Sequence, residues 1–220
     1  KIITLAPEIE GAKEFIEKVS KKGITVSVAH SAAGYDIIKK AESWGLSHAA
    51  HLFNAMTGLH HRKPGIVGAV LNGNMTAELI ADYVHINPAV LELVTKTKEL
   101  EKIILVTDSM EAGGLEAGEY SLGGQKVFVE NGEAKLEDGT IAGSVLTLDK
   151  AVRNMLNATN LDINEVINMV TLNPAKRIGL DHKIGQLKEG LKSDLVLLDK
   201  NLKVSKVFLE GEENRGDFYL

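Results

Sequence analysis

The feature that most constrains this chain is a regular alternation of short apolar runs with amphipathic segments. Apolar runs begin near residues 2, 24, 48, 76 and 102, so successive starts lie 22, 24, 28 and 26 residues apart. That step is the length of one strand and one helix, and strands that are apolar throughout and separated by helices predict a parallel sheet. A similar repeat builds an eight-stranded (β/α)8 barrel. Five strands are three too few to close one, so a flat doubly wound sheet stays open as an alternative.

The strands are expected over 2–6, 24–30, 48–54, 76–84 and 102–108, each short and rich in apolar or β-branched residues. Helical spacing of apolar side chains predicts helices within 10–23 and 34–45, and a third helix is expected after the fourth strand. The clearest start is Asn87 followed by Pro88, which is typical of an N-cap and a first helical position.

After Asp108 the pattern changes. The pairs Asn131–Gly132 and Asp138–Gly139 stand between short alternating runs and predict β-hairpin structure. Two helices should follow, the second capped by Asp162, before the tail returns to strands. We therefore expect a catalytic α/β portion over residues 1–180, with a hairpin insertion around 115–140, and part of a small β subdomain over 181–220.

The composition narrows the range of possible partners and metal sites. The formal net charge of -5 gives no reason to expect a nucleic-acid partner. Because the chain has no Cys, disulfides and thiolate metal sites are excluded, which fits a cytoplasmic location. No apolar run is long enough to cross a bilayer and no signal peptide is recognisable, so no membrane partner is expected. The chain begins at Lys1 in an apolar run, which is typical of the middle of a larger protein.

Polar side chains gather where the predicted strands end. In a parallel α/β protein, chemistry concentrates at the carboxyl ends of the strands. Neutral imidazoles bind divalent metals, and a carboxylate beside the metal can act as general base and then acid. Three strand ends therefore predict a catalytic metal site, and further polar residues lie nearby. The residues are His30, His51, Asn54, Asp82, His85 and Asp108.

Other residues in the same region have simpler interpretations. His48 is interpreted as structural, and His60 and His61 as solvated in a polar loop. Asp82 could equally cap or pair locally. The basic loop at 60–65 would suit a phosphate or carboxylate at the mouth of a site. Ser144 precedes a predicted helix, where it is either an ordinary cap or part of an anion site.

Several distinctive stretches follow one another along the chain: "APE" (6–8), "VAHSAA" (28–33), "HLFNAM" (51–56), "RKPG" (62–65), "LIADYVHI" (79–86), "LVTDSMEAGG" (105–114) and "LEDGTIAGSVLTLDKAVRN" (136–154). Together they resemble the N-acetylglucosamine-6-phosphate deacetylases, a family within the amidohydrolase superfamily of metal-dependent barrels. The resemblance covers essentially the whole chain. A further stretch at 187–199 looks like the superfamily's C-terminal strand motif, which joins a small β-sandwich.

The resemblance implies roles for individual residues. His30 and His51 look like metal ligands, for zinc, iron, manganese or cobalt, and Asp108 looks like the catalytic aspartate. Arg62 aligns with a phosphate-binding arginine that reaches into a neighbouring subunit, which implies a homodimer. The remaining residues align with positions that contact the substrate: Asn54, Ala55, His85, Ile141, Ala142 and Gly143.

The same resemblance implies that the family's first three strands are absent from this chain. The missing part includes the first strand, with its His-x-His-type motif, and the third strand, with a metal-binding glutamate. The five strands would then be strands four to eight. Taken alone, such a chain is expected to be inactive, to bind metal weakly, and to associate through its open edges. Apolar side chains on the inner face should be exposed; the candidates are Val26, Val28, Leu105 and Val106.

The implied function is hydrolysis of the N-acetyl group of N-acetylglucosamine 6-phosphate, a small sugar phosphate, in amino-sugar catabolism. A metal-activated water would attack the amide while Asp108 handles the proton. Two alternatives stay open. One is another amidohydrolase of the dihydroorotase kind, and the other is a non-catalytic sugar-phosphate-binding fragment.

Overall fold

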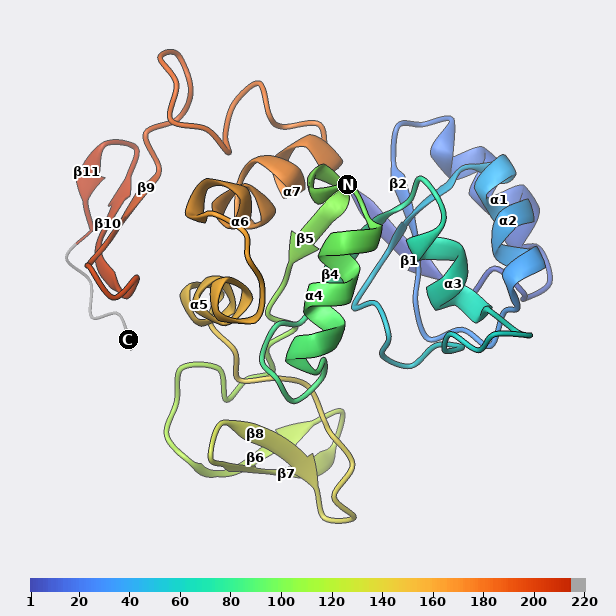
Figure 1. Ribbon diagram of the computed structural model, residues 1–220, viewed down its shortest axis with the longest axis horizontal. Helices are drawn as coiled ribbons and strands as arrows, with labels where there is room; N and C mark the ends of the chain where they lie inside the picture. Colours follow the sequence, from blue (N-terminus) through green and yellow to red (C-terminus); the bar gives the residue numbers. More distant parts are fainter. Residues whose placement is uncertain (215–220) are drawn as a thin grey trace.

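The computed structural model describes residues 1–214, so the last six residues of the expected C-terminal subdomain lie outside the described residues. Its centre is a five-stranded sheet in which every neighbouring pair is parallel (Figure 1). The strand order is β1-β2-β3-β4-β5, the same as the order along the chain. The strands are β1 (Ile2–Leu5), β2 (Thr25–Val28), β3 (Leu46–Ala49), β4 (Thr76–Leu79) and β5 (Ile103–Leu105).

The consecutive strand order decides between the two predicted architectures. Crossovers between parallel strands are right-handed, so an unreversed order places the connecting helices on one face of the sheet. A doubly wound sheet needs a point where the order reverses, and this sheet has none. The doubly wound alternative is therefore wrong, and the sheet is wound as in one portion of a barrel.

All five strands are shorter than predicted, and two of them show what ends the strand. The strand predicted over 48–54 starts at Leu46 and stops at Ala49, and the one predicted over 76–84 stops at Leu79. Residues beyond these points, including His51 and Tyr83, adopt positive φ angles and cannot continue a strand. The polar residues thus follow the strands in turns.

Four helices and a short 3-10 helix connect the strands. Asn87 caps its helix as predicted, because its side chain accepts a hydrogen bond from the backbone of Ala89. The helix over Gly65–Leu71 was not predicted, since six of its seven residues are buried and no polar face marks its period. The elements are α1 (Ala12–Ser20), α2 (Tyr35–Trp44), α3 (Gly65–Leu71), α4 (Pro88–Thr97) and η1 (Leu100–Lys102).

The expected exposure of apolar side chains on the sheet is wrong. Val26 and Val28 are fully buried within the main core cluster, Leu105 is buried and Val106 is half-buried. Successive strand residues point to opposite faces, so Thr25 lies on the other face from Val26. That face carries polar groups: Thr25 accepts a hydrogen bond from the Arg177 guanidinium at 3.1 Å, whereas the buried hydroxyl of Ser27 has no partner among the described residues.

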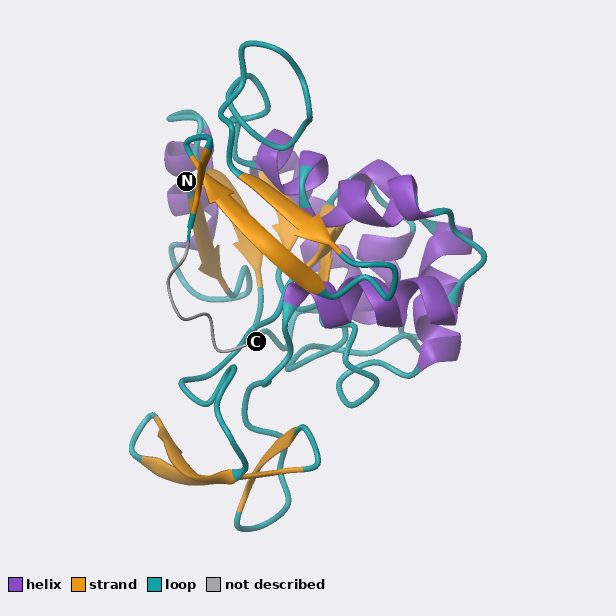
Figure 2. Cartoon of the chain, turned by 90° about the vertical axis from the view of Figure 1, so that its left-hand side faces the viewer, coloured by secondary structure: helices purple, strands orange, loops and turns teal. Residues whose placement is uncertain are grey.

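After β5 the chain leaves the sheet to form a three-stranded antiparallel sheet (Figure 2). Asn131 and Gly132 have φ angles of 52° and 79°, as the predicted two-residue turn requires. The sheet has its own small core around Val127 and Val129. Its strands are β6 (Gly118–Leu122), β7 (Gln125–Glu130) and β8 (Glu133–Leu136).

The chain then returns to three helices and a second small antiparallel sheet. Asp162 forms the expected cap, here as a capping box with Glu165. Among the described residues, none of the helices is both long and apolar enough to cross a membrane. The elements are α5 (Leu148–Ala158), α6 (Ile163–Val170), α7 (Leu172–Arg177), β9 (Leu195–Leu198), β10 (Val204–Leu209) and β11 (Glu212–Glu213).

Candidate functional site

Three predicted site residues lie just beyond the carboxyl ends of β2, β3 and β5. His30 lies two residues beyond β2, His51 two beyond β3, and Asp108 three beyond β5. All three have positive φ angles, of 47°, 31° and 49°. Such backbone conformations cost about 1–3 kcal/mol per non-glycine residue and concentrate at functional sites. The turns therefore hold these side chains at one end of the sheet at an energetic cost.

The rings of His30 and His51 lie side by side. Their centroids are 5.0 Å apart and their planes are nearly perpendicular, at 84°. Two imidazoles bound to one tetrahedral zinc ion have centroids about 5 Å apart, because each ligating nitrogen lies about 2.0–2.1 Å from the metal. In addition, Nδ1 of His51 is buried and has no hydrogen-bond partner among the described residues. The pair therefore fits a divalent metal.

A complete metal site needs more than this pair. Within residues 1–214, no group of three or more His, Cys, Asp or Glu side chains is close enough to hold a metal ion. A catalytic zinc site has three protein ligands and one open position. The described residues bring together two candidate ligands for such a site, His30 and His51.

Asp108 stands where the insertion leaves the sheet and returns to it. The backbone N–H of Ser144 donates to the carbonyl of Asp108 at 3.2 Å, and that of Met110 donates to the carbonyl of Ser144 at 2.9 Å. Gly143, with a φ of 74°, precedes this junction. The predicted substrate-contacting segment 141–143 is therefore brought beside Asp108, with Ala142 buried and Ile141 exposed.

The interpretation of Ser144 as a helix cap is wrong. Its hydroxyl donates to the carbonyl of Thr107 and accepts from the backbone of Leu146, while the cap of α5 is Thr147. Ser144 therefore ties the end of the insertion to the turn after β5.

Asn54 and Ala55 lie in the turn that follows His51. The Asn54 side chain donates to the carbonyls of His51 and Leu52 at 3.2 and 3.3 Å. Ala55, with a φ of 48°, accepts a hydrogen bond from the backbone of Ser31 at 3.1 Å. The turn after His51 is thereby joined to the turn after His30.

Glu8 is a residue whose role was not foreseen. Its two carboxylate oxygens accept from the Ser31 hydroxyl at 2.6 Å and from the Ala32 backbone at 2.7 Å, so it anchors the turn beside His30. The "APE" stretch drew attention to this position only as part of a resemblance. Its contact spans 23 residues of sequence, which no local pattern reveals.

His85 is paired with Asp82 in the turn after β4. The Asp82 carboxylate lies 2.7 Å from Nδ1 of His85 and also accepts from the backbone of Val84 and His85. Burial alone raises the pKa of the Asp82 carboxyl, but these hydrogen bonds and the adjacent imidazole outweigh it and hold the pKa below its usual value. The local pairing considered for Asp82 is therefore present.

The other histidines in this region agree with their simpler interpretations. His48 is fully buried, with Nδ1 2.6 Å from the Thr76 hydroxyl and Nε2 2.9 Å from Glu78. His60 and His61 are exposed and their rings are 4.2 Å apart. The exposed Arg62 contacts residues of its own loop: its backbone N–H donates to Nδ1 of His60, and its guanidinium lies 2.6 Å from Nε2 of His61. The structure does not bring Arg62 to the other candidates.

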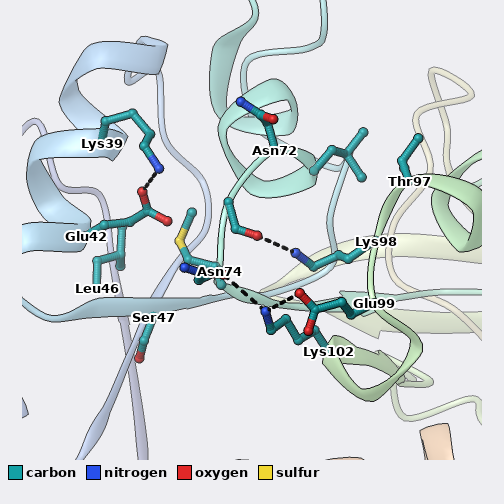
Figure 3. Close-up of a pocket in the computed structure, with 13 residues that line it drawn as sticks. Lys39, Glu42, Leu46, Ser47, Asn72, Asn74, Thr97, Lys98, Glu99 and Lys102 are labelled. Carbon is teal, nitrogen blue, oxygen red and sulfur yellow. Dashed lines mark hydrogen bonds and ion pairs between the residues drawn. The ribbon is translucent and has the colours of Figure 1, made fainter.

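Two cavities border the sheet. A cavity of about 330 Å³ is lined by Asp108, Arg177 and a larger number of apolar side chains, such as Leu105. A cavity of about 570 Å³ lies at the opposite end of the strands, and its three lysines already have partners (Figure 3). Lys98, for example, donates to the carbonyls of Val70 and Gly73, and burial lowers its pKa to about 8. The larger cavity is therefore not the candidate site.

A profile of the amidohydrolase family matches residues 4–213. Among curated proteins, the chain is 41% identical over 212 residues to the N-acetylglucosamine-6-phosphate deacetylase of Lysinibacillus sphaericus, covering 96% of this chain and 54% of that protein. It is 39% identical over 213 residues to the N-acetylgalactosamine-6-phosphate deacetylase of Escherichia coli O157:H7, covering 96% and 56%. The chain therefore spans about half the length of these relatives.

Solved structures agree in fold. The N-acetylglucosamine-6-phosphate deacetylase of Pasteurella multocida superposes with a TM-score of 0.92 at 33% identity, covering 97% of this chain and 56% of that one. A mutant of the Mycobacterium smegmatis deacetylase, solved in complex with N-acetyl-D-glucosamine-6-phosphate, gives a TM-score of 0.91 at 34% identity, covering 96% and 57%.

Proposed function

Because the chain belongs to the amidohydrolase family, we propose that its protein hydrolyses the N-acetyl group of N-acetylglucosamine 6-phosphate. The products are glucosamine 6-phosphate and acetate, in the amino-sugar catabolism of the cytoplasm. The observation that carries the proposal is the pairing of His30 and His51 at 5.0 Å on adjacent strand ends. Relatives named for this reaction match over nearly all of the chain.

His30 and His51 would hold a divalent metal, such as zinc, iron, manganese or cobalt. When bound, such an ion activates water and polarises the amide carbonyl. Asp108 accepts the proton of the attacking water and then delivers it to the nitrogen of the departing amino sugar. Its backbone is tied to Ser144, which keeps the carboxylate at the mouth where the substrate segment 141–143 arrives.

The remaining candidates would hold the sugar phosphate. Asn54, Ala55 and His85 lie on turns after β3 and β4, at the same end of the sheet as the metal pair. Arg62 is exposed and apart from this group, so it would complete the phosphate site of a second subunit in a homodimer. In this proposal the five strands form strands four to eight of a closed barrel, and β9–β11 belong to a small β-sandwich.

The test is an acetate-release assay on the metal-loaded protein, with N-acetylglucosamine 6-phosphate and N-acetylglucosamine as substrates. The proposal expects acetate from the phosphorylated sugar, loss of activity with a chelator, and recovery with added metal. Release of ring-opened product from a cyclic imide would instead support a dihydroorotase-like enzyme. Binding of the sugar phosphate without acetate release by the metal-loaded protein would support a non-catalytic binding role.

A second candidate substrate is N-acetylgalactosamine 6-phosphate. It is favoured by the 39% identity to a relative named for that sugar. The two sugars differ only in the configuration of one hydroxyl, so the same metal pair and Asp108 would serve both. The ratio of their kcat/KM values in the same assay decides between them.

A further inference from the structure

The turn that carries His85 is held more firmly than a surface turn needs to be. Tyr83, at its centre, has a φ of 72°, and its hydroxyl donates to the backbone carbonyl of Asn154 at 2.5 Å. The Asn154 side chain in turn donates to the carbonyl of Ala81 at 2.8 Å. Two hydrogen bonds therefore join the turn to helix α5, and the Asp82 side chain bonds to the backbone of the turn itself.

The Asp82 carboxylate is shared between the backbone and the imidazole. Oδ1 accepts from Val84 N at 2.9 Å and from His85 N at 2.8 Å, and Oδ2 lies 2.7 Å from Nδ1 of His85. Both side chains are nearly inaccessible, at 8% for Asp82 and 7% for His85. All three contacts stabilise the ionised carboxylate, which agrees with its lowered pKa.

An ionised carboxylate can only accept hydrogen bonds. The hydrogen of a neutral His85 ring must therefore sit on Nδ1, and Nε2 carries the lone pair. Among the described residues, Asp82 is the hydrogen-bond partner of Nδ1, and Nε2 has no partner. Nε2 is thus the ring nitrogen left for a ligand.

We propose that Asp82 is a positioning residue, which fixes the tautomer and orientation of His85 so that Nε2 faces the substrate. This proposal rests on the proposed function for the identity of the ligand, but the tautomer itself is a property of the free protein. It deepens the account of substrate binding, because it adds a residue that need not touch the substrate.

The first experiment measures the tautomer directly by ¹⁵N NMR of histidine-labelled protein. In the wild type, the neutral His85 ring should show a protonated Nδ1 and an unprotonated Nε2. Asp82→Asn should shift the ring toward the opposite tautomer, because the amide NH2 group can donate to Nδ1 while the amide oxygen still accepts from the backbone. A wild-type ring protonated on Nε2, or an unchanged ring in Asp82→Asn, would overturn the proposal.

Asp162→Asn is the matched control. Asp162 accepts backbone hydrogen bonds from Asn164 and Glu165 in the same local pattern, but within residues 1–214 its side chain has no hydrogen bond with an imidazole. Its substitution should leave the His85 signals in place. A His85 shift of similar size in this control would show that the Asp82→Asn effect is a general response to a lost carboxylate, and would contradict the proposal.

The second experiment compares kinetics on N-acetylglucosamine 6-phosphate. Asp82→Asn should raise KM about tenfold, the size typical of groups that orient a functional histidine. The double variant with His85→Ala should be no worse than His85→Ala alone, because the two residues act as one unit. Additive effects would contradict the proposal. If the wild-type protein showed the predicted tautomer but no deacetylation, the proposed function would be wrong, whereas the positioning of His85 by Asp82 would still hold.

Discussion

Glu8 offers a sharp test of how the turn beside His30 is held. Its carboxylate accepts from the Ser31 hydroxyl and the Ala32 backbone, across 23 and 24 residues of sequence. The turn it anchors begins at His30, whose φ of 47° is unfavourable without support. Replacing Glu8 by Ala removes both acceptors, whereas Gln keeps one oxygen.

The expected loss follows from these two hydrogen bonds. Each contributes about 0.5–1.5 kcal/mol net, and exposure of the Glu8 side chain places their sum near the lower half of the range, at about 1–2 kcal/mol. If that energy maintains the position of His30, the affinity for metal should fall about five- to thirtyfold in Glu8→Ala. Glu8→Gln should lie between this variant and the wild type.

The assay is competition for Zn²⁺ with a chromophoric chelator, read together with the midpoint of urea unfolding. Glu10→Ala is the control, since Glu10 is an exposed neighbour whose side chain makes no hydrogen bond or ion pair with the other described residues. Its affinity should equal that of the wild type. Equal zinc affinity in Glu8→Ala and Glu10→Ala would refute the idea that Glu8 supports the position of His30.

Three further predictions follow from the same structure. Asp108→Asn should retain bound metal but lower the rate of acetate release about 10²–10⁴-fold, because an amide cannot take the proton; near-normal turnover would exclude this role. Arg62→Ala should weaken binding of the phosphorylated sugar by about 1.5–3 kcal/mol with little effect on the unphosphorylated one, as isothermal titration would show; equal losses would make Arg62 structural. Asp162→Ala should lower the free energy of unfolding by about 1 kcal/mol in urea titration, because it removes the cap of α6; an unchanged midpoint would mean that the capping box adds no stability.

The period of apolar runs was enough to predict the parallel sheet. Strands buried on both faces need no tertiary detail to be recognised, and β5 is an example, buried throughout as its apolar sequence indicates. The helix α3 could not be predicted in this way. Its sequence is apolar on all sides, and two of its seven residues are glycines, which have a low helix propensity. The helix is therefore stabilised by burial in the fold and not by the intrinsic preferences of its residues.

The placement of three candidate site residues could also be predicted from the order of the strands. His30, His51 and Asp108 follow strands, so topology alone brings them to one end of the sheet. These three residues have positive φ angles, and the strands end just before them. Both features depend on turns that have no recognisable sequence pattern here. The anchoring role of Glu8 depends on a contact across 23 residues, and only the fold reveals it.

The central claim is that His30 and His51 bind one metal ion together. X-ray absorption spectroscopy of the zinc-loaded protein tests it most directly, because the ring atoms beyond the Zn–N bond of about 2.0 Å give imidazole ligands a recognisable multiple-scattering pattern. The account predicts two imidazoles on zinc in the wild type, one in His30→Ala, one in His51→Ala, and two in the control His48→Gln. An unchanged imidazole count in both single variants would contradict it.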